Sequence, residues 1–177
     1  MSGWEKIQLQ SNCKDYNKMN TTDHNYFMQK AIELAAENAG SVTGGPFGAV
    51  IVKDGEIVAM QSNKVTVEND PTAHAEVNAI RAACKKLGTF DLSGCILYSS
   101  CEPCPMCLSA AYWAHIDKIY YAADRFDAAR VGFDDEFIYK ELSTDISARR
   151  IGAVQIMHTE GLVPFNMWQN NSSKTDY

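Results

Sequence analysis

The sequence predicts a single α/β domain whose helices cover both faces of a mixed sheet. Short apolar runs of strand length, such as Phe47–Val52 and Cys95–Ser99, alternate with segments whose apolar residues recur at helical spacing. Strands with helices between them typically fold into layers. With 177 residues and 46% hydrophobic content, the chain can bury one sizeable core and is too short for two comfortable domains.

Local signals give the boundaries of most elements. Asp23 suits a helix N-cap, Asp54-Gly55 a hairpin turn, Gly88 a helix end and Pro105 the first turn of a helix. The elements expected in order are a helix over 23–40, strands over 47–52 and 57–60, a helix over 72–87, a strand over 95–99, a helix from 105, a strand over 118–123, short helices over 124–131 and 137–142, a strand over 154–157 and a last helix over 162–170.

The domain is expected to span residues 23–177. Residues 1–22 are polar, lack helical periodicity and carry no cap, so they are interpreted as an extension outside the fold. They also lack the basic and apolar regions of a signal peptide. No stretch approaches the roughly 20 apolar residues that cross a bilayer. These features favour a cytosolic protein without a membrane partner.

Charge and cysteine content narrow the classes of partner. The chain has 16 Lys and Arg against 22 Asp and Glu, a net charge of −6, and no basic run that could follow a phosphate backbone. Nucleic acid is therefore not expected as a partner. Three of the six cysteines fall at 101, 104 and 107. In a reducing compartment this clustering favours metal or thiol chemistry over disulfides.

His74, Cys104 and Cys107 form the predicted metal site. Catalytic zinc usually takes three protein ligands and leaves a fourth position for water. Both ligand segments begin a predicted helix, where backbone N–H groups and the helix dipole stabilise thiolates. Glu76, two residues from His74, is a carboxylate that is not needed as a ligand, and its position suits a proton shuttle. An H-x-E followed by P-C-x-x-C is typical of zinc deaminases.

The cysteines allow two other interpretations. Cys101 and Cys104 also form a C-x-x-C pair, but Pro precedes Cys104 and not Cys101, so Cys101 is interpreted as a packed thiol or as a group behind the ligands. C-x-x-C alone could be a redox motif or half of a structural zinc site. A structural site would normally recruit a fourth Cys or His. His24, His115 and His158 are assigned to surface or core positions.

Five tracts carry a resemblance to a known family. GGPFGAVIVKDG (44–55), NDPTAHAEVNAIRAACKKLG (69–88), LYSSCEPCPMC (97–107), AYWA (111–114) and DAARVGFDDEFIYKE (127–141) resemble the bacterial-type guanine deaminases. The resemblance covers roughly residues 24 to 177. The zinc motif alone marks the broader cytidine-deaminase-like superfamily, whereas the GFDD-x-FIYKE tract is more discriminating.

The resemblance implies hydrolysis of guanine to xanthine and ammonia on a three-layer α/β/α fold with a five-stranded mixed sheet. His74, Cys104 and Cys107 would then hold one Zn²⁺ per subunit. Glu76 and Asp135 match the family's catalytic positions, and Asp135 would also recognise guanine. Asn63 matches the base-contacting asparagine of the family. Phe47, which could stack on the base, and Ala75, Trp113 and Tyr177 are the further expected substrate contacts.

The same resemblance implies a homodimer in which the C-terminal segment, about 160–177, is swapped between subunits. Trp113 and Tyr177 match positions associated with that swap, in which the last helix covers the active site of the neighbour. The aromatic C-terminal tail fits equally well a lid over its own domain. Without the resemblance, Asp135 reads as a solvated loop acid or a helix N-cap, and Phe47 reads equally well as core.

Several competing functions remain open from the sequence. A tRNA adenosine deaminase has a similar E-P-C-x-M-C segment but should carry a basic surface, which a chain of net charge −6 does not predict. Deamination of guanosine, cytosine or another small ring depends on pocket shape. A zinc-stabilised binding module that is not an enzyme is the alternative from a different class.

Overall fold

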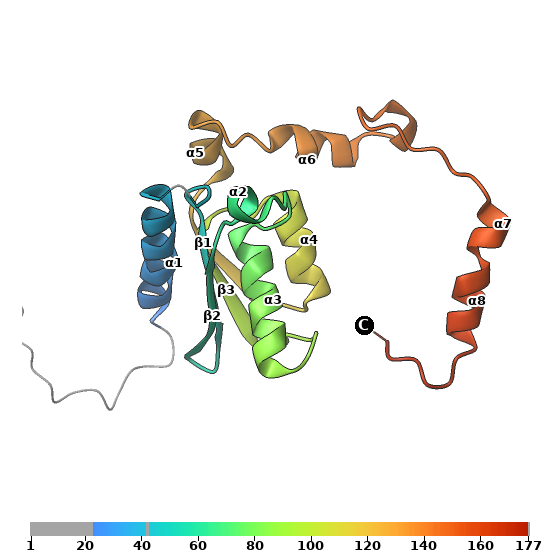
Figure 1. Cartoon of the computed structure of the whole chain (residues 1–177), viewed down its shortest axis with the longest axis horizontal. Helices are drawn as coiled ribbons and strands as arrows, with labels where there is room; N and C mark the ends of the chain where they lie inside the picture. The colour runs from blue at the N-terminus through green and yellow to red at the C-terminus, as the bar shows by residue number, and fades with distance from the viewer. Residues whose placement is uncertain (1–22, 42, 177) are drawn as a thin grey trace, which may run out of the picture.

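The computed structural model describes residues 23–41 and 43–176. The expected polar extension over residues 1–22, and Tyr177, lie outside the described residues. A four-stranded sheet forms the centre of the fold, with α1 on one face and α3 and α4 on the other (Figure 1). This arrangement confirms the predicted α/β layering.

The sheet is mixed, with strand order β2-β1-β3-β4. Its strands are β1 (Gly48–Lys53), β2 (Glu56–Ser62), β3 (Cys95–Cys101) and β4 (Lys118–Ala123). β1 pairs antiparallel with both β2 and β3, whereas β3 and β4 are parallel. Asp54 and Gly55, with φ angles of 51° and 80°, make the hairpin turn between β1 and β2, as their sequence predicted.

Alternate residues of β1 supply the cores on the two faces of the sheet. Val50 and Val52 meet Phe27 and Ala31 of α1 (His24–Ala39), with Tyr98 of β3 in the same cluster. The side chain of Asp23 accepts a hydrogen bond from the Tyr26 N–H, so this residue is the N-cap that the sequence predicted. The near-continuous apolar sequence of β1 thus reflects a strand that is buried on both faces.

The opposite face is covered by α3 (Ala75–Leu87) and α4 (Pro105–Trp113). Ala49 and Ile51 of β1 belong to the same core cluster as Ala79 and Ile80 of α3. α3 ends at Gly88, whose φ of 69° is a conformation that few other residues adopt readily. Its first residue is Ala75, so the expected start at residue 72 was three residues too early.

The remaining elements are short. They are α2 (Val65–Glu68), α5 (Arg125–Arg130), α6 (Glu136–Ser143), η1 (Ile146–Ala148), α7 (His158–Gly161) and α8 (Val163–Gln169). α6 extends beyond the sheet, and the chain then curves away so that α7 and α8 lie at the far end of an arm (Figure 1). None of the described helices is long and apolar enough to cross a membrane.

The expectation of a five-stranded sheet is wrong for the described residues, which form four strands. The missing strand is the one expected over residues 154–157. Val154 and Ile156 are 87% and 77% exposed. A strand needs a neighbour to satisfy its backbone groups, and this segment lies in the arm between α6 and α7, away from the sheet (Figure 1). Its β-branched residues fit a strand, but its position leaves it unpaired.

The packing of α1 on β1 depends on the absence of a side chain at Gly48. A Cβ at this position would lie 2.7 Å from the Leu34 Cβ and would overlap the Ala31 carbonyl. We therefore expect Gly48→Ala to lower the free energy of unfolding by about 1–3 kcal/mol, the usual cost of overpacking. Urea unfolding measures this change. The matched control is Gly40→Ala, where the nearest atoms would be 3.6 Å away; equal stability of the two variants would contradict this packing.

Candidate active site

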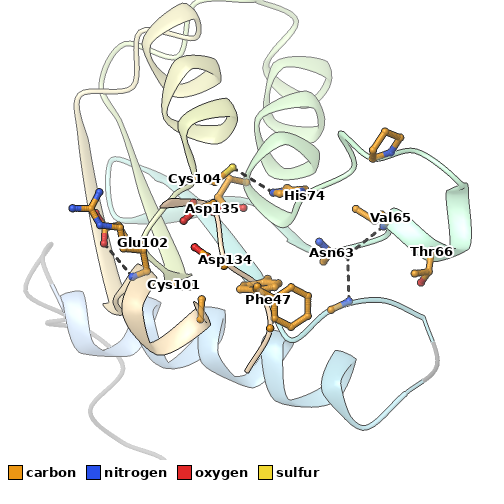
Figure 2. Close-up of a pocket in the computed structure, with 17 residues that line it drawn as sticks. Phe47, Asn63, Val65, Thr66, His74, Cys101, Glu102, Cys104, Asp134 and Asp135 are labelled. Carbon is orange, nitrogen blue, oxygen red and sulfur yellow. Dashed lines mark hydrogen bonds between the residues drawn. The ribbon is translucent and has the colours of Figure 1, made fainter. Parts of the chain in front are cut away.

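Two helix N-termini bring the predicted metal ligands together. His74 is the N-cap of α3, and Cys104 is the N-cap of α4, directly before Pro105. Neither side chain makes a capping hydrogen bond, and Cys104 lies directly beside the His74 ring (Figure 2). Cys107, in the first turn of α4, is fully buried behind them. As the sequence predicted, a helix begins at each ligand segment. α4 begins at Pro105 as expected, and α3 begins three residues later than expected.

The three ligand atoms have the spacing that a tetrahedral zinc ion requires. His74 Nδ1 lies 3.6 Å from Cys104 Sγ and 3.5 Å from Cys107 Sγ, and the two sulfurs are 3.5 Å apart. Tetrahedral bonds of about 2.0 Å to nitrogen and about 2.3 Å to sulfur place such atoms roughly 3.5–3.8 Å apart. The donor set therefore fits zinc, and among the described residues it forms one compact three-residue group.

The electrostatics of the cluster favour a deprotonated sulfur. The hydrogen-bond contact with the Cys107 sulfur, and then the one with His74, lower the pKa of Cys104 to about 4 despite its burial. The same Cys107–Cys104 hydrogen bond, with burial, raises the pKa of Cys107. The Cys104 sulfur in turn raises the pKa of His74. One thiolate is thus available before a cation arrives, and thiolates are the form that binds metal.

Glu76 is a buried carboxyl beside this cluster. It is 5% exposed, its Oε1 accepts a hydrogen bond from the Ser99 hydroxyl at 3.1 Å, and its Oε2 lies 3.5 Å from Cys107 Sγ. Burial raises the pKa of Glu76, and the hydrogen bond from Ser99 partly opposes this rise. Glu76 also lines the pocket in front of the ligands. Burial therefore favours the protonated form of this carboxyl, and a buried carboxyl beside a metal site can act as an acid or base.

Cys101 lies apart from the ligand group. Its Sγ is 3.5 Å from the Asp124 carbonyl, and burial raises its pKa to about 11, so the thiol stays protonated. This placement agrees with its interpretation as a packed thiol.

A pocket of about 370 Å³ opens in front of the His74 and Cys104 side chains. Asn63 forms one wall (Figure 2). Its Oδ1 accepts hydrogen bonds from the Gly45 and Val65 N–H groups at 3.3 and 3.2 Å. These two donors fix the orientation of the amide, and they leave its NH₂ group available to a ligand in the pocket.

Phe47 and Phe133 form an aromatic wall of the same pocket. Their ring centroids are 4.9 Å apart and their planes meet at 86°, an edge-to-face contact. Phe47 comes from the start of the sheet, whereas Phe133 comes from the loop after α5. The contact therefore joins the central fold to the segment that carries Asp134 and Asp135.

Asp135 reaches the pocket and does not act as a helix cap. It occupies the N-cap position of α6, but its side chain makes no capping hydrogen bond. Asp134 accepts from the Glu136 N–H instead, at 3.0 Å. The Asp135 side chain lies beside Cys104 (Figure 2). Burial, and then the Cys104 sulfur, raise the pKa of Asp135, while Arg125 opposes this shift.

Two of the expected substrate contacts, Ala75 and Trp113, are not brought to this pocket. Ala75 is fully buried at the start of α3 and is not among the pocket residues. Trp113, at the end of α4, is 67% exposed and also lies outside the pocket. Tyr177 lies outside the described residues.

Ser99, Glu102 and Arg125 were missed from the sequence as contributors to the site. Ser99 bonds Glu76, while Glu102 and Arg125 line the pocket. Glu102 and Arg125 follow the carboxyl ends of the parallel strands β3 and β4. Ligands commonly bind at that edge of a sheet, so the position of these polar residues was a usable signal.

Comparison with known proteins identifies the class. The model of the cytidine and deoxycytidylate deaminase zinc-binding region matches residues 21–123. The chain therefore belongs to this family of zinc-binding deaminases, whose fold it shares. More particularly, it is 55% identical to the guanine deaminase of Bacillus subtilis (strain 168) over 155 residues, which cover 88% of this chain and 99% of the relative.

Solved structures extend the comparison. The X-ray structure of guanine deaminase from Bacillus subtilis matches 88% of this chain and 99% of its own with a TM-score of 0.85 and 54% identity. A tRNA-specific adenosine deaminase from Agrobacterium fabrum (strain C58) is more distant, at 43% identity over 57% of this chain and 66% of the relative. A variant of another related protein, solved with 8-azaguanine, is 34% identical over 62% of this chain and 63% of its own, with a TM-score of 0.59.

Metal content tests the ligand assignment. Loss of a residue that only hydrogen-bonds to a metal ligand typically weakens metal binding roughly 10–100-fold. Cys104→Ala removes a predicted ligand itself, so we expect it to weaken zinc binding by more than this. Cys101→Ala, a matched change three residues earlier, should keep the zinc content of the unaltered protein. Atomic absorption after dialysis against a weak chelator measures both variants. Zinc loss from the Cys101 variant alone would reverse the assignment.

Proposed function

We propose that this chain is a hydrolase that converts guanine and water to xanthine and ammonia, a step of purine catabolism or salvage. The observation that carries the proposal is the pocket, where Glu76, Asn63 and Asp135 face the open side of a three-ligand zinc site. The relationship to guanine deaminase of Bacillus subtilis supports the choice of base.

The metal would be one zinc ion per chain, held by His74, Cys104 and Cys107. When bound, the ion would lower the pKa of a water molecule to about 7, which would supply the nucleophile at neutral pH. The pocket opens onto His74 and Cys104, and so the site differs from a closed structural zinc site.

Glu76 would carry the protons. It takes a proton as the water oxygen attacks C2 of guanine and delivers it to the adjacent ring nitrogen. Glu76 then takes the second proton, from the hydroxyl now bonded to C2, and passes it to the exocyclic amino group, which leaves as ammonia while the C2 carbonyl forms. The raised pKa of Glu76 suits these steps, because the group must be able both to accept and to donate a proton. The Ser99 hydroxyl holds the carboxylate while it does so.

Recognition of the base would come from the pocket walls. The Asn63 NH₂ group can donate to an acceptor atom of the purine, and the Phe47 ring offers an apolar face. The Asp135 carboxylate can accept from N1–H and the amino group of guanine. Adenine presents a bare N1 acceptor at that edge, so a carboxylate there disfavours it.

The charge at the site argues against a tRNA substrate. Glu102, Asp134 and Asp135 line the pocket, and Arg125 is the one basic side chain, apart from His74, among the pocket residues. The whole chain carries a net charge of −6. A protein that binds an RNA backbone normally offers basic residues around its site.

Guanine turnover with a shuttle variant tests the proposal. We expect the purified protein to convert guanine to xanthine, followed by ultraviolet absorbance. Glu76→Gln should keep its zinc and lose about 10²–10⁴-fold in kcat, the usual contribution of a positioned acid or base. Glu136→Gln, an exposed acid of α6 outside the pocket, is the control and should retain turnover. Turnover of a different base by the unaltered protein would disprove the substrate assignment and leave the zinc chemistry intact.

We also propose that the chain is a homodimer in which residues 151–176 cover the partner. Every residue from 151 to 173 is exposed in the single chain, including Phe165 and Met167 of α8, which are 70% and 69% exposed. A run of large apolar side chains on an arm requires a surface that can bury it.

A complementary surface exists beside α4 and β4. Tyr112 and Trp113 of α4 are 75% and 67% exposed, and Tyr121 of β4 is 50% exposed. These side chains and the arm together supply apolar area of the kind that buried interfaces use. An exchange of arms between two chains would cover both surfaces at once.

The mass of the assembly tests the dimer. We expect light scattering to give twice the 19.6 kDa of the chain. Phe165→Ser should shift the population toward monomer, because it removes about 1.5–3 kcal/mol of apolar burial from each arm. Asn166→Ser, the next residue on α8 and also exposed, should leave the mass unchanged. A monomeric unaltered protein would contradict the exchange of arms.

A further inference from the structure

The segment that carries Asp135 is weakly attached to the rest of the fold. None of the residues of α6 is buried, and the helix projects beyond the sheet (Figure 1). The Asp135 side chain makes no capping hydrogen bond that could hold it. Yet its carboxylate must keep a fixed place opposite the metal ligands if it is to contact a substrate. Other contacts must therefore fix this segment.

The first attachment lies before Asp135. Phe133 makes the edge-to-face contact with Phe47, with 4.9 Å between ring centroids. Gly132, with a φ of 96°, turns the chain so that Phe133 can reach the pocket. This contact fixes only one end of the Asp134–Asp135 turn.

The second attachment lies one helical turn after Asp135. The Tyr139 hydroxyl donates a hydrogen bond to the Pro103 carbonyl at 3.1 Å. Residues four apart share a helix face, so Tyr139 and Asp135 approach the domain on the same side of α6. Pro103 directly precedes Cys104. The hydrogen bond thus connects α6 to the turn that presents a metal ligand.

Arg125 holds the Tyr139 ring in place. The guanidinium carbon lies 4.6 Å from the ring centroid, a cation–π distance. The Arg125 backbone N–H donates to Glu102 Oε2 at 3.1 Å, which ties the start of α5 to the same turn. Within the described part of the chain, Arg125 Nε is buried without a hydrogen-bond partner. Contact with the Tyr139 ring therefore partly replaces its lost hydration.

We infer that Tyr139 is a positioning residue for Asp135, and that its hydrogen bond to Pro103 sets the distance between the Asp135 carboxylate and the metal-ligand turn. The inference rests on the proposed deaminase function. Tyr139 itself is not among the pocket residues and would not touch the substrate. Its effect on turnover would pass through Asp135 alone.

Removal of the hydroxyl tests the inference without removing the ring. A displacement of about 1 Å at a catalytic group can cost on the order of 100-fold in rate. Loss of the hydrogen bond at one of the two attachments should allow part of that displacement. We expect Tyr139→Phe to lower kcat for guanine by roughly 10-fold, with KM less affected and zinc content unchanged. The control is Tyr26→Phe on α1, which removes a hydroxyl from an exposed ring far from the pocket and should retain full activity.

A double-mutant cycle separates positioning from general stability. Tyr139→Phe should change kcat by less than about two-fold when Asp135→Asn is already present, because the group that it positions is then impaired. The same cycle is measured for xanthine binding by calorimetry, which does not depend on turnover. An unchanged kcat for Tyr139→Phe beside an active unaltered protein overturns the inference, as does an equal loss in both backgrounds.

The proposed function fails in a different way. It fails when the unaltered protein releases no xanthine from guanine, whatever the Tyr139 variant does. In that event the cycle is measured with the base that the protein does deaminate, and a loss confined to the Asp135-containing background still supports the positioning role.

Discussion

The meeting of two helix N-termini is the constraint on which the site depends. α3 and α4 pack on the same face of the sheet, and both begin close to one point, where His74 and Cys104 are the N-caps. Exposed backbone N–H groups and the positive ends of two helix dipoles favour negative charge there. The low pKa of Cys104, about 4, is consistent with that environment. Any shift of either helix would separate the ligand atoms.

The same point must also hold a carboxyl group that is not a ligand. Glu76 is buried beside Cys107 and is satisfied by Ser99 from the central strand β3. Because β3 also leads into the Cys104 turn, a single strand positions both Ser99, the partner of the acid, and the two cysteines of the predicted metal site. Asp135 is held differently, by two contacts that attach the segment around α6 at the edge of the domain. Glu76 and the cysteines thus lie on packed elements of the central fold, whereas Asp135 lies on a segment held by only a few contacts.

Much of the fold could be predicted because its signals are local. Caps at Asp23 and Gly88, the turn at Asp54-Gly55 and the continuous apolar sequence of β1 each have a direct physical cause, and the structure contains them all. The strand expected over 154–157 does not form, and the local sequence does not show why. β-Branched residues favour a strand, but a strand also needs a neighbour, and the path of the chain after α6 gives this segment none.

The sequence by itself determined which chemical groups the site contains. Its residue types and spacing specified two sulfurs, one imidazole and a nearby acid at helix starts, because ligand spacing and capping are short-range properties. Only the tertiary structure decided which distant groups complete the site. The orientation of the Asn63 amide, the Ser99 contact to Glu76 and the Tyr139–Pro103 hydrogen bond join residues from different elements. Such contacts depend on how strands and helices pack, and no local sequence pattern encodes that geometry.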